Sequence, residues 1–104
     1  GVQTCALPIS ETAFYILFCL QEPQHGYGIG QEVKAMTKGE VSISPGTMYG
    51  TLSKMEKDGL INFVSEAEKR KIYEITELGR EILTTEMNRI KRIYINSIGD
   101  EYNG

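Results

Sequence analysis

Residues 44–76 constrain the fold of this chain more than any other stretch, because they contain clear helix and strand boundaries. Ser44 is suited to cap a helix, since its hydroxyl can accept a hydrogen bond from a backbone N–H in the first turn. Pro45 suits the first helical position, where its missing N–H donor costs nothing. Gly59 is a typical residue to end a helix. The pattern predicts one helix over Pro45–Asp58.

The two sides of this helix differ in chemistry. Met48, Leu52 and Met55 are spaced by four and three residues, which places them on one buried stripe. The opposite side is small, polar and basic, and it carries Thr47, Gly50, Thr51 and Lys54. Hydroxyl and ammonium groups on an exposed helix are suited to contacts with phosphates and base edges.

Two short strands are predicted after the helix, over Leu60–Glu66 and Lys71–Ile75, with a turn at Ala67–Arg70. Three consecutive cations, Lys69–Lys71, lie at or beside this turn. A solvated turn would explain these cations taken alone. A polar, basic helix followed by a basic hairpin is instead typical of a winged helix-turn-helix that meets DNA.

The remaining chain predicts three further helices. One begins at Ser10 and ends before Pro23, and another runs from near His25 to Gly39. The last and longest covers Glu77–Ile98, and its apolar positions follow a 4-3-4 spacing at Leu83, Met87, Ile90 and Tyr94. Because a small domain cannot easily bury so long a stripe, we expect a homodimer that pairs through this helix, with Phe14 and Leu17 also in the interface. A helix folded back on its own domain is the alternative.

The predicted fold class is therefore mainly α with a small β-hairpin. A winged helix-turn-helix DNA-binding domain covers residues 10–76, a C-terminal dimerisation helix covers 77–98, and a polar tail covers 99–104. Residues 1–9, GVQTCALPI, have no charge and no clear period, and they resemble the translation of a sequencing-library adapter. We expect this segment to be non-native and exclude it from the fold.

Composition limits the function. The 104 residues suffice for one domain. The net charge of −3 counts against a nucleic-acid binder, since such domains are usually basic. We therefore expect DNA contact to be confined to Ser44–Lys54 and Lys69–Lys71. No apolar run approaches the roughly 20 residues of a membrane span, so a soluble, cytoplasmic protein without membrane contact is expected.

Catalysis, metals and cofactors are not expected. No nucleophile–base set or metal-ligand spacing is visible. His25 is the only histidine, and it is predicted to cap or pack, with pH sensing as the alternative. Cys19 is predicted to be a small buried hydrophobe rather than a redox or metal group. Gly26, Gly28 and Gly30 miss the spacing of a GxGxxG phosphate loop, which favours close helix packing or a frayed first turn.

Four motifs, in the same order, resemble those of PadR-family transcriptional regulators. Residues 23–29, PQHGYGI, are similar to the family's P-x-H-G-Y-x-I, and residues 44–49, SPGTMY, to its S/G-P-G-T-L-Y. Residues 58–61, DGLI, and 70–76, RKIYEIT, complete the pattern. The resemblance covers Ser10–Ile98 and corresponds to the short form of the family, which has one C-terminal helix.

The resemblance implies a homodimeric winged-helix repressor that binds a near-palindromic operator and pairs through its last helix. It also implies a small aromatic effector, such as a phenolic acid or a flat drug, near the dimer interface. Members that bind aromatic drugs often carry a tryptophan on the last helix, and this chain has no tryptophan. Tyr94 and Tyr15 are the remaining effector candidates. A winged-helix protein-interaction module without sequence-specific DNA binding is the alternative function.

We expect nine residues to contact DNA. Tyr49 is included for its hydroxyl, although it could equally flank the core. The set is Ser44, Gly46, Thr47, Tyr49, Thr51, Lys54, Lys69, Arg70 and Lys71.

Overall fold

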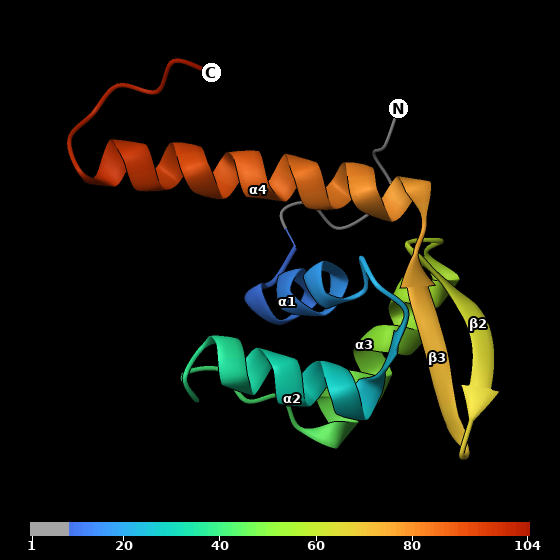
Figure 1. The fold of residues 1–104 in the computed structure, drawn as a ribbon. Coiled ribbons are helices and arrows are strands. Elements are labelled where there is room, and N and C mark those ends of the chain that lie inside the picture. The colour runs from blue at the N-terminus through green and yellow to red at the C-terminus, as the bar shows by residue number, and fades with distance from the viewer. Residues whose placement is uncertain (1–8) are drawn as a thin grey trace.

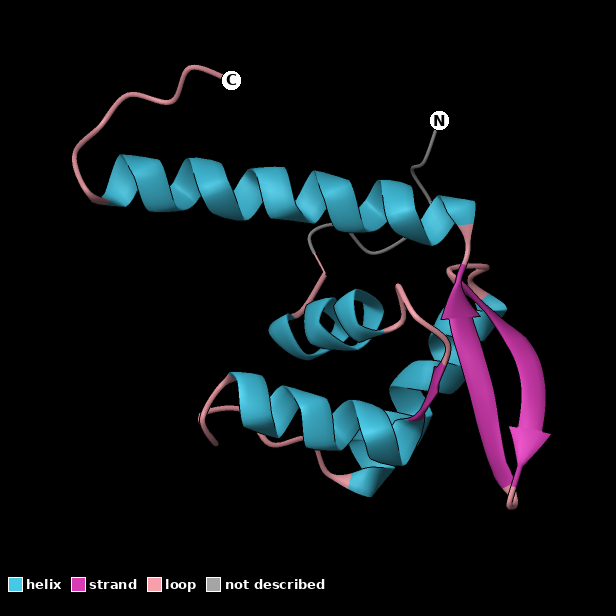
Figure 2. Ribbon diagram, in the orientation of Figure 1, coloured by secondary structure: helices cyan, strands magenta, loops and turns pink. Residues whose placement is uncertain are grey.

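The computed structural model describes residues 9–104, which form four helices and a small antiparallel sheet (Figures 1 and 2). Helix α1 lies between α2 and α4, and the sheet stands at one end of the helices beside α3 (Figure 1). In chain order the elements are α1 (Glu11–Cys19), β1 (Gln24–His25), α2 (Gly26–Met36), α3 (Pro45–Lys57), β2 (Ile61–Ala67), β3 (Arg70–Ile75) and α4 (Glu77–Ser97). This is the winged helix-turn-helix arrangement with a long additional helix, as predicted.

Each helix begins at a residue whose side chain accepts a backbone hydrogen bond three residues further on. Ser44, the predicted cap, does this for α3, and Thr76 does it for α4 with a bond 3.0 Å long. Ser10 caps α1, and Nδ1 of His25 accepts from the Gly28 amide at 3.0 Å to cap α2. The capping role predicted for His25 is therefore confirmed.

The sheet has three strands in the order β1-β3-β2, one more than the predicted hairpin (Figure 2). In the added pair, Gln24 lies opposite Tyr73 and His25 opposite Ile72. The sequence could not indicate β1, because two residues are too few to show a strand period. This short strand ties the start of α2 to the middle of β3.

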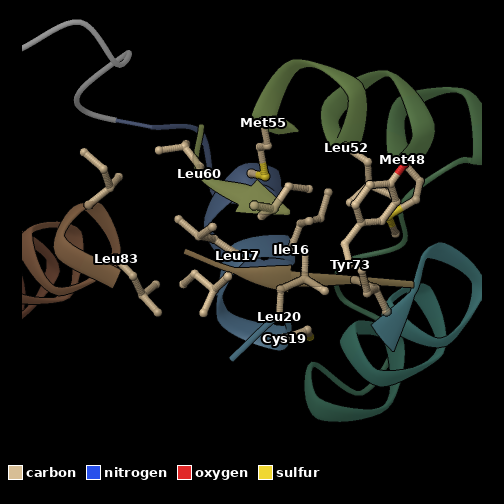
Figure 3. Packing of buried hydrophobic residues seen from close by; sticks show 14 of the residues in the cluster. Ile16, Leu17, Cys19, Leu20, Met48, Leu52, Met55, Leu60, Tyr73 and Leu83 are labelled. Atoms are coloured by element: carbon tan, nitrogen blue, oxygen red, sulfur yellow. The ribbon is translucent and has the colours of Figure 1, made fainter. Parts of the chain in front are cut away.

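The hydrophobic core centres on α1. Figure 3 shows Ile16, Leu17 and Leu20 between side chains of α3 and Leu83 of α4. The predicted stripe on α3 is confirmed, since Met48, Leu52 and Met55 are all buried. Leu17 has no exposed surface, so our assignment of this residue to a dimer interface was wrong: it is used in the core of its own subunit.

Residues 1–8 lie outside the described part of the structure, so the non-native origin of residues 1–9 remains a prediction. Ile9 packs against the core. Within residues 9–104, no helix combines the length and apolar character needed to cross a bilayer.

Candidate nucleic-acid interface

The first turn of α3 presents a row of accessible polar groups. The Ser44 hydroxyl accepts a hydrogen bond from the Thr47 amide at 3.2 Å and donates one to Thr47 Oγ1 at 3.0 Å. Both residues are exposed, and Tyr49 is 54% exposed. A Cβ atom added at Gly46 would meet no atom within 4 Å, so the backbone is open to a close partner there.

Two residues of the predicted α3 face are less available than expected. Thr51 is only half-exposed. The Lys54 ammonium lies 3.1 Å from Asp58 Oδ2, in an ion pair one turn further along the helix. An exposed pair of this kind is worth at most about 1 kcal/mol, so it does not prevent Lys54 from turning to a phosphate. It does reduce the positive charge at this end of α3.

The hairpin of β2 and β3 forms a wing with a basic tip. Glu68 and Lys69 form its two-residue turn, with backbone φ angles of +52° and +65°. Lys69, Arg70 and Lys71 are all exposed, and within residues 9–104 none of them lies within 4 Å of a carboxylate oxygen. Three cations without ion-pair partners are free to neutralise phosphate charge.

The structure brings the wing and α3 to the same depression. Its volume is about 360 Å³, and it is lined by Tyr49 and Ser53 of α3 and by the three wing cations. Tyr49 also packs closely over Gly26, because a Cβ atom at this glycine would lie 2.8 Å from the tyrosine ring. The close packing predicted for the glycines of α2 is thus seen at Gly26.

Helix α2 adds exposed groups that were not predicted to contact DNA. Tyr27 is 55% exposed, and its ring centre lies 4.7 Å from the guanidinium carbon of Arg70. Gln31 donates a hydrogen bond to the Tyr27 hydroxyl at 2.9 Å. Tyr27, Gln31 and Lys34 line a second depression, of about 230 Å³, together with the first turn of α3. The signal was present as the i, i+4, i+7 spacing of these residues.

The last helix has two different apolar regions. Near its start, Ile82 and Leu83 are buried against the rest of the subunit. Leu83 is only 3% exposed, so its assignment to the dimer interface was wrong, as for Leu17. Further along, Met87 is 44% exposed, Ile90 43% and Tyr94 62%, and the helix continues past the N-terminal end of α1 (Figure 1). The remaining exposed apolar residues of this region are Ile93 and Ile98.

The α1–α4 junction contains the other residues assigned to dimerisation or effector binding. Phe14 and Tyr15 are half-buried and, with Ile90, line a depression of about 390 Å³. In its wall, Arg89 donates two hydrogen bonds, of 2.9 and 2.8 Å, to the buried Glu86 carboxylate. Tyr94 does not line this depression, so the two effector candidates are not brought together.

Cys19 is a buried free thiol, as predicted. Burial raises its pKa to about 12, with hydrogen bonding to Glu32 and the negative charge of that carboxylate adding to the effect. Almost none of the thiol is ionised near neutral pH, which makes it a poor nucleophile and metal ligand.

Known proteins with similar sequences are transcriptional regulators or uncharacterised. The profile of the transcriptional regulator PadR-like family matches residues 16–85. Transcriptional regulator Rv3488 of Mycobacterium tuberculosis is 30% identical over 80 residues, which cover 74% of this chain and 72% of that protein. An uncharacterised protein of Lysinibacillus sphaericus is 35% identical over 69 residues, and the match spans 62% of this chain but only 63% of that protein.

The fold also matches a solved structure. A transcriptional regulator from Clostridium thermocellum superposes with a TM-score of 0.71 at 25% identity, covering 85% of this chain and 92% of that one.

Proposed function

Because the chain belongs to the PadR-like family of transcriptional regulators, we propose that it is a homodimeric repressor that binds a near-palindromic operator and is released by a small-molecule effector. The observation that carries the DNA-binding part is the shared surface of α3 and the wing. Exposed hydroxyl groups of α3 and the three wing cations line the same depression there.

In this proposal, the first turn of α3 enters the major groove. Thr47 and Tyr49 are exposed enough to reach base edges or backbone, and the open backbone at Gly46 permits close approach to a phosphate. Ser44 has the supporting task of fixing Thr47, since it hydrogen-bonds both its amide and its hydroxyl. Thr51 and Lys54 contribute further along the helix.

The wing contacts the neighbouring phosphates or minor groove through Lys69, Arg70 and Lys71. These contacts supply affinity without sequence information, because every phosphate carries the same charge. They also explain how a protein with a net charge of −3 can bind DNA. Among the described residues 9–104, no carboxylate oxygen lies within 4 Å of the charged groups of these three cations.

Dimerisation is assigned to the exposed apolar stretch of α4 around Met87, Ile90 and Tyr94, with Phe14 at its margin. Side chains of this kind are costly to leave in water, and covering them with a second copy would stabilise both. Two subunits would place two α3 helices in successive major grooves, with half-sites about 10 base pairs apart or a multiple of this.

An effector would act by binding one arrangement of the dimer better than the other. The depression beside Phe14 and Tyr15 lies at the α1–α4 junction, where a ligand would contact both the subunit core and the dimerisation helix. Its aromatic wall suits a flat aromatic compound.

Fluorescence anisotropy with the DNA upstream of the protein's own gene tests the proposal. We expect saturable binding that scrambled DNA of equal length does not show. Exchanging Lys69, Arg70 and Lys71 together for alanine should weaken binding to all sequences. It should also flatten the dependence of log K on log salt by about 0.9 for each lost phosphate contact. Thr47→Ala is the matched α3 variant, and it should change the preferred sequence rather than the salt slope.

The outcomes separate the competing functions. Equal, weak binding to both DNAs would favour a protein-interaction module instead. An unchanged salt slope in the triple variant would contradict the assignment of the wing.

A further inference from the structure

Arg70 differs from the other two wing cations because it is held against another element. Its guanidinium carbon lies 4.7 Å from the centre of the Tyr27 ring, within the range of a cation–π interaction. The tyrosine hydroxyl, at the other end of the ring, accepts a hydrogen bond of 2.9 Å from Gln31. The three side chains form a continuous contact from α2 to the wing.

We propose that Tyr27 is a positioning residue for DNA binding, which holds the Arg70 guanidinium ready for a phosphate. This inference rests on the proposed function. It assigns to α2 a role in aligning the wing, rather than a direct contact with a base.

The chemistry of arginine suits this arrangement. A guanidinium stacked on an aromatic face keeps its N–H donors around the edge of the plane, where they can still donate to a phosphate. Within residues 9–104, no carboxylate lies within 4 Å to occupy these donors. Tyr27 therefore restricts the arginine without neutralising it.

The backbone explains why the two residues meet. Strand β1 pairs with β3 so that His25 lies opposite Ile72. Continuing the two antiparallel chains from this pair places Tyr27 near Arg70. Without the stack, a long side chain on an exposed strand would lose rotamer freedom on binding, at a cost in affinity. With the stack, much of that ordering is present before DNA arrives.

A double-mutant cycle measures this role. Tyr27→Leu should lower affinity for the operator about three- to ten-fold with little change in salt slope, because no cation is lost. Tyr27→Phe keeps the aromatic face and should bind within about two-fold of the wild type. In an Arg70→Ala background, Tyr27→Leu should cause no further loss. In a Lys71→Ala background, which serves as the matched control, its effect should persist.

The contact itself is measurable without DNA. The side-chain NMR signals of Arg70 should be shifted by the Tyr27 ring current in the free protein, and the shift should survive Tyr27→Phe but not Tyr27→Leu. Absence of the shift would overturn the contact. If Tyr27→Leu lowered the affinity for the operator as much in the Arg70→Ala background as in the wild type, the positioning role would be overturned. The proposed DNA-binding function would not be affected by this result. If the wild type binds no DNA although the shift is present, the proposed function fails, and this role fails with it.

Discussion

Gly79 and Gly50 both lie inside helices, yet a methyl group would meet very different surroundings at each. At Gly79, in the first turn of α4, an added Cβ would overlap the Leu60 carbonyl oxygen and lie 2.7 Å from the Ile75 side chain. At Gly50, on the exposed side of α3, it would meet nothing within 4 Å. Only the first glycine is required by packing, since it lets α4 approach the start of β2.

We expect Gly79→Ala to lower the free energy of unfolding by about 1–3 kcal/mol, because backbone atoms must move to relieve the overlap. Gly50→Ala should instead raise it by about 0.5–1 kcal/mol, because alanine loses less entropy in a helix. Urea denaturation at one fixed protein concentration compares the two variants. Equal stability of the two would contradict the close approach at Gly79.

At this scale, some roles could be predicted and others could not. Capping by Ser44 and Thr76 depends on residues three positions apart, so the sequence contains the whole signal. The Tyr27–Arg70 stack depends on the pairing of β1 with β3, which brings together distant parts of the chain. For the same reason the sequence could not show that Leu17 is enclosed by its own subunit.

Among the elements, the wing has the least favourable local backbone. Both residues of its turn, Glu68 and Lys69, have positive φ, although neither is glycine or asparagine. Two-residue hairpins of this geometry favour Asn-Gly or Asp-Gly, because other side chains crowd the backbone there. Lys69 therefore destabilises the turn slightly, while its side chain adds positive charge to the tip of the wing.

Replacing Glu68 by asparagine should raise the free energy of unfolding by about 0.5–1 kcal/mol, since asparagine tolerates this conformation better. Lys38, with φ of +53°, offers a matched substitution away from the wing, and Lys38→Asn should stabilise by a similar amount. Thermal unfolding followed by circular dichroism measures both changes. If only Lys38→Asn stabilised the protein, the backbone conformation at Glu68 would not lower the free energy of unfolding as we expect.

The helices and the hairpin could be predicted from local sequence patterns, and their predicted boundaries lie within a few residues of the observed ones. Helix α4 was predicted to Ile98 and ends at Ser97, and α3 was predicted to Asp58 and ends at Lys57. The exception is β1, whose two residues carry no period and are extended only because β3 lies beside them.

For the whole molecule, the division of α4 into a buried start and an exposed continuation is the main asymmetry. The start of α4 packs into the core of its own subunit, as the alternative of a helix folded back on its own domain would require. The continuation leaves Met87, Ile90 and Tyr94 substantially exposed within the subunit. The sequence showed one stripe and could not show where the intramolecular contact stops, because that depends on the position of α1.

Ile90→Glu should therefore shift the protein from dimer to monomer, because a carboxylate would have to be buried between two copies. Sedimentation velocity over a range of concentrations measures the change. Asn88→Glu introduces the same charge nearly on the opposite side of the helix and should leave the dimer intact. A dimer that survives Ile90→Glu would place the interface elsewhere.

The connection between the wing and α4 is short and held by hydrogen bonds. A single residue, Thr76, separates β3 from α4, and its amide and hydroxyl bond to Leu60 O at 3.0 Å and Gly59 O at 2.7 Å. Helix α4 is thus a beam clamped at one end, about 32 Å long at 1.5 Å per residue. In a pair joined through α4, a tilt of about 10° would carry the clamped end through roughly 5 Å, more than the 3.4 Å or so between successive base pairs. A small change of the angle between the two α4 helices would therefore be enough to move both wings out of register with the DNA groove.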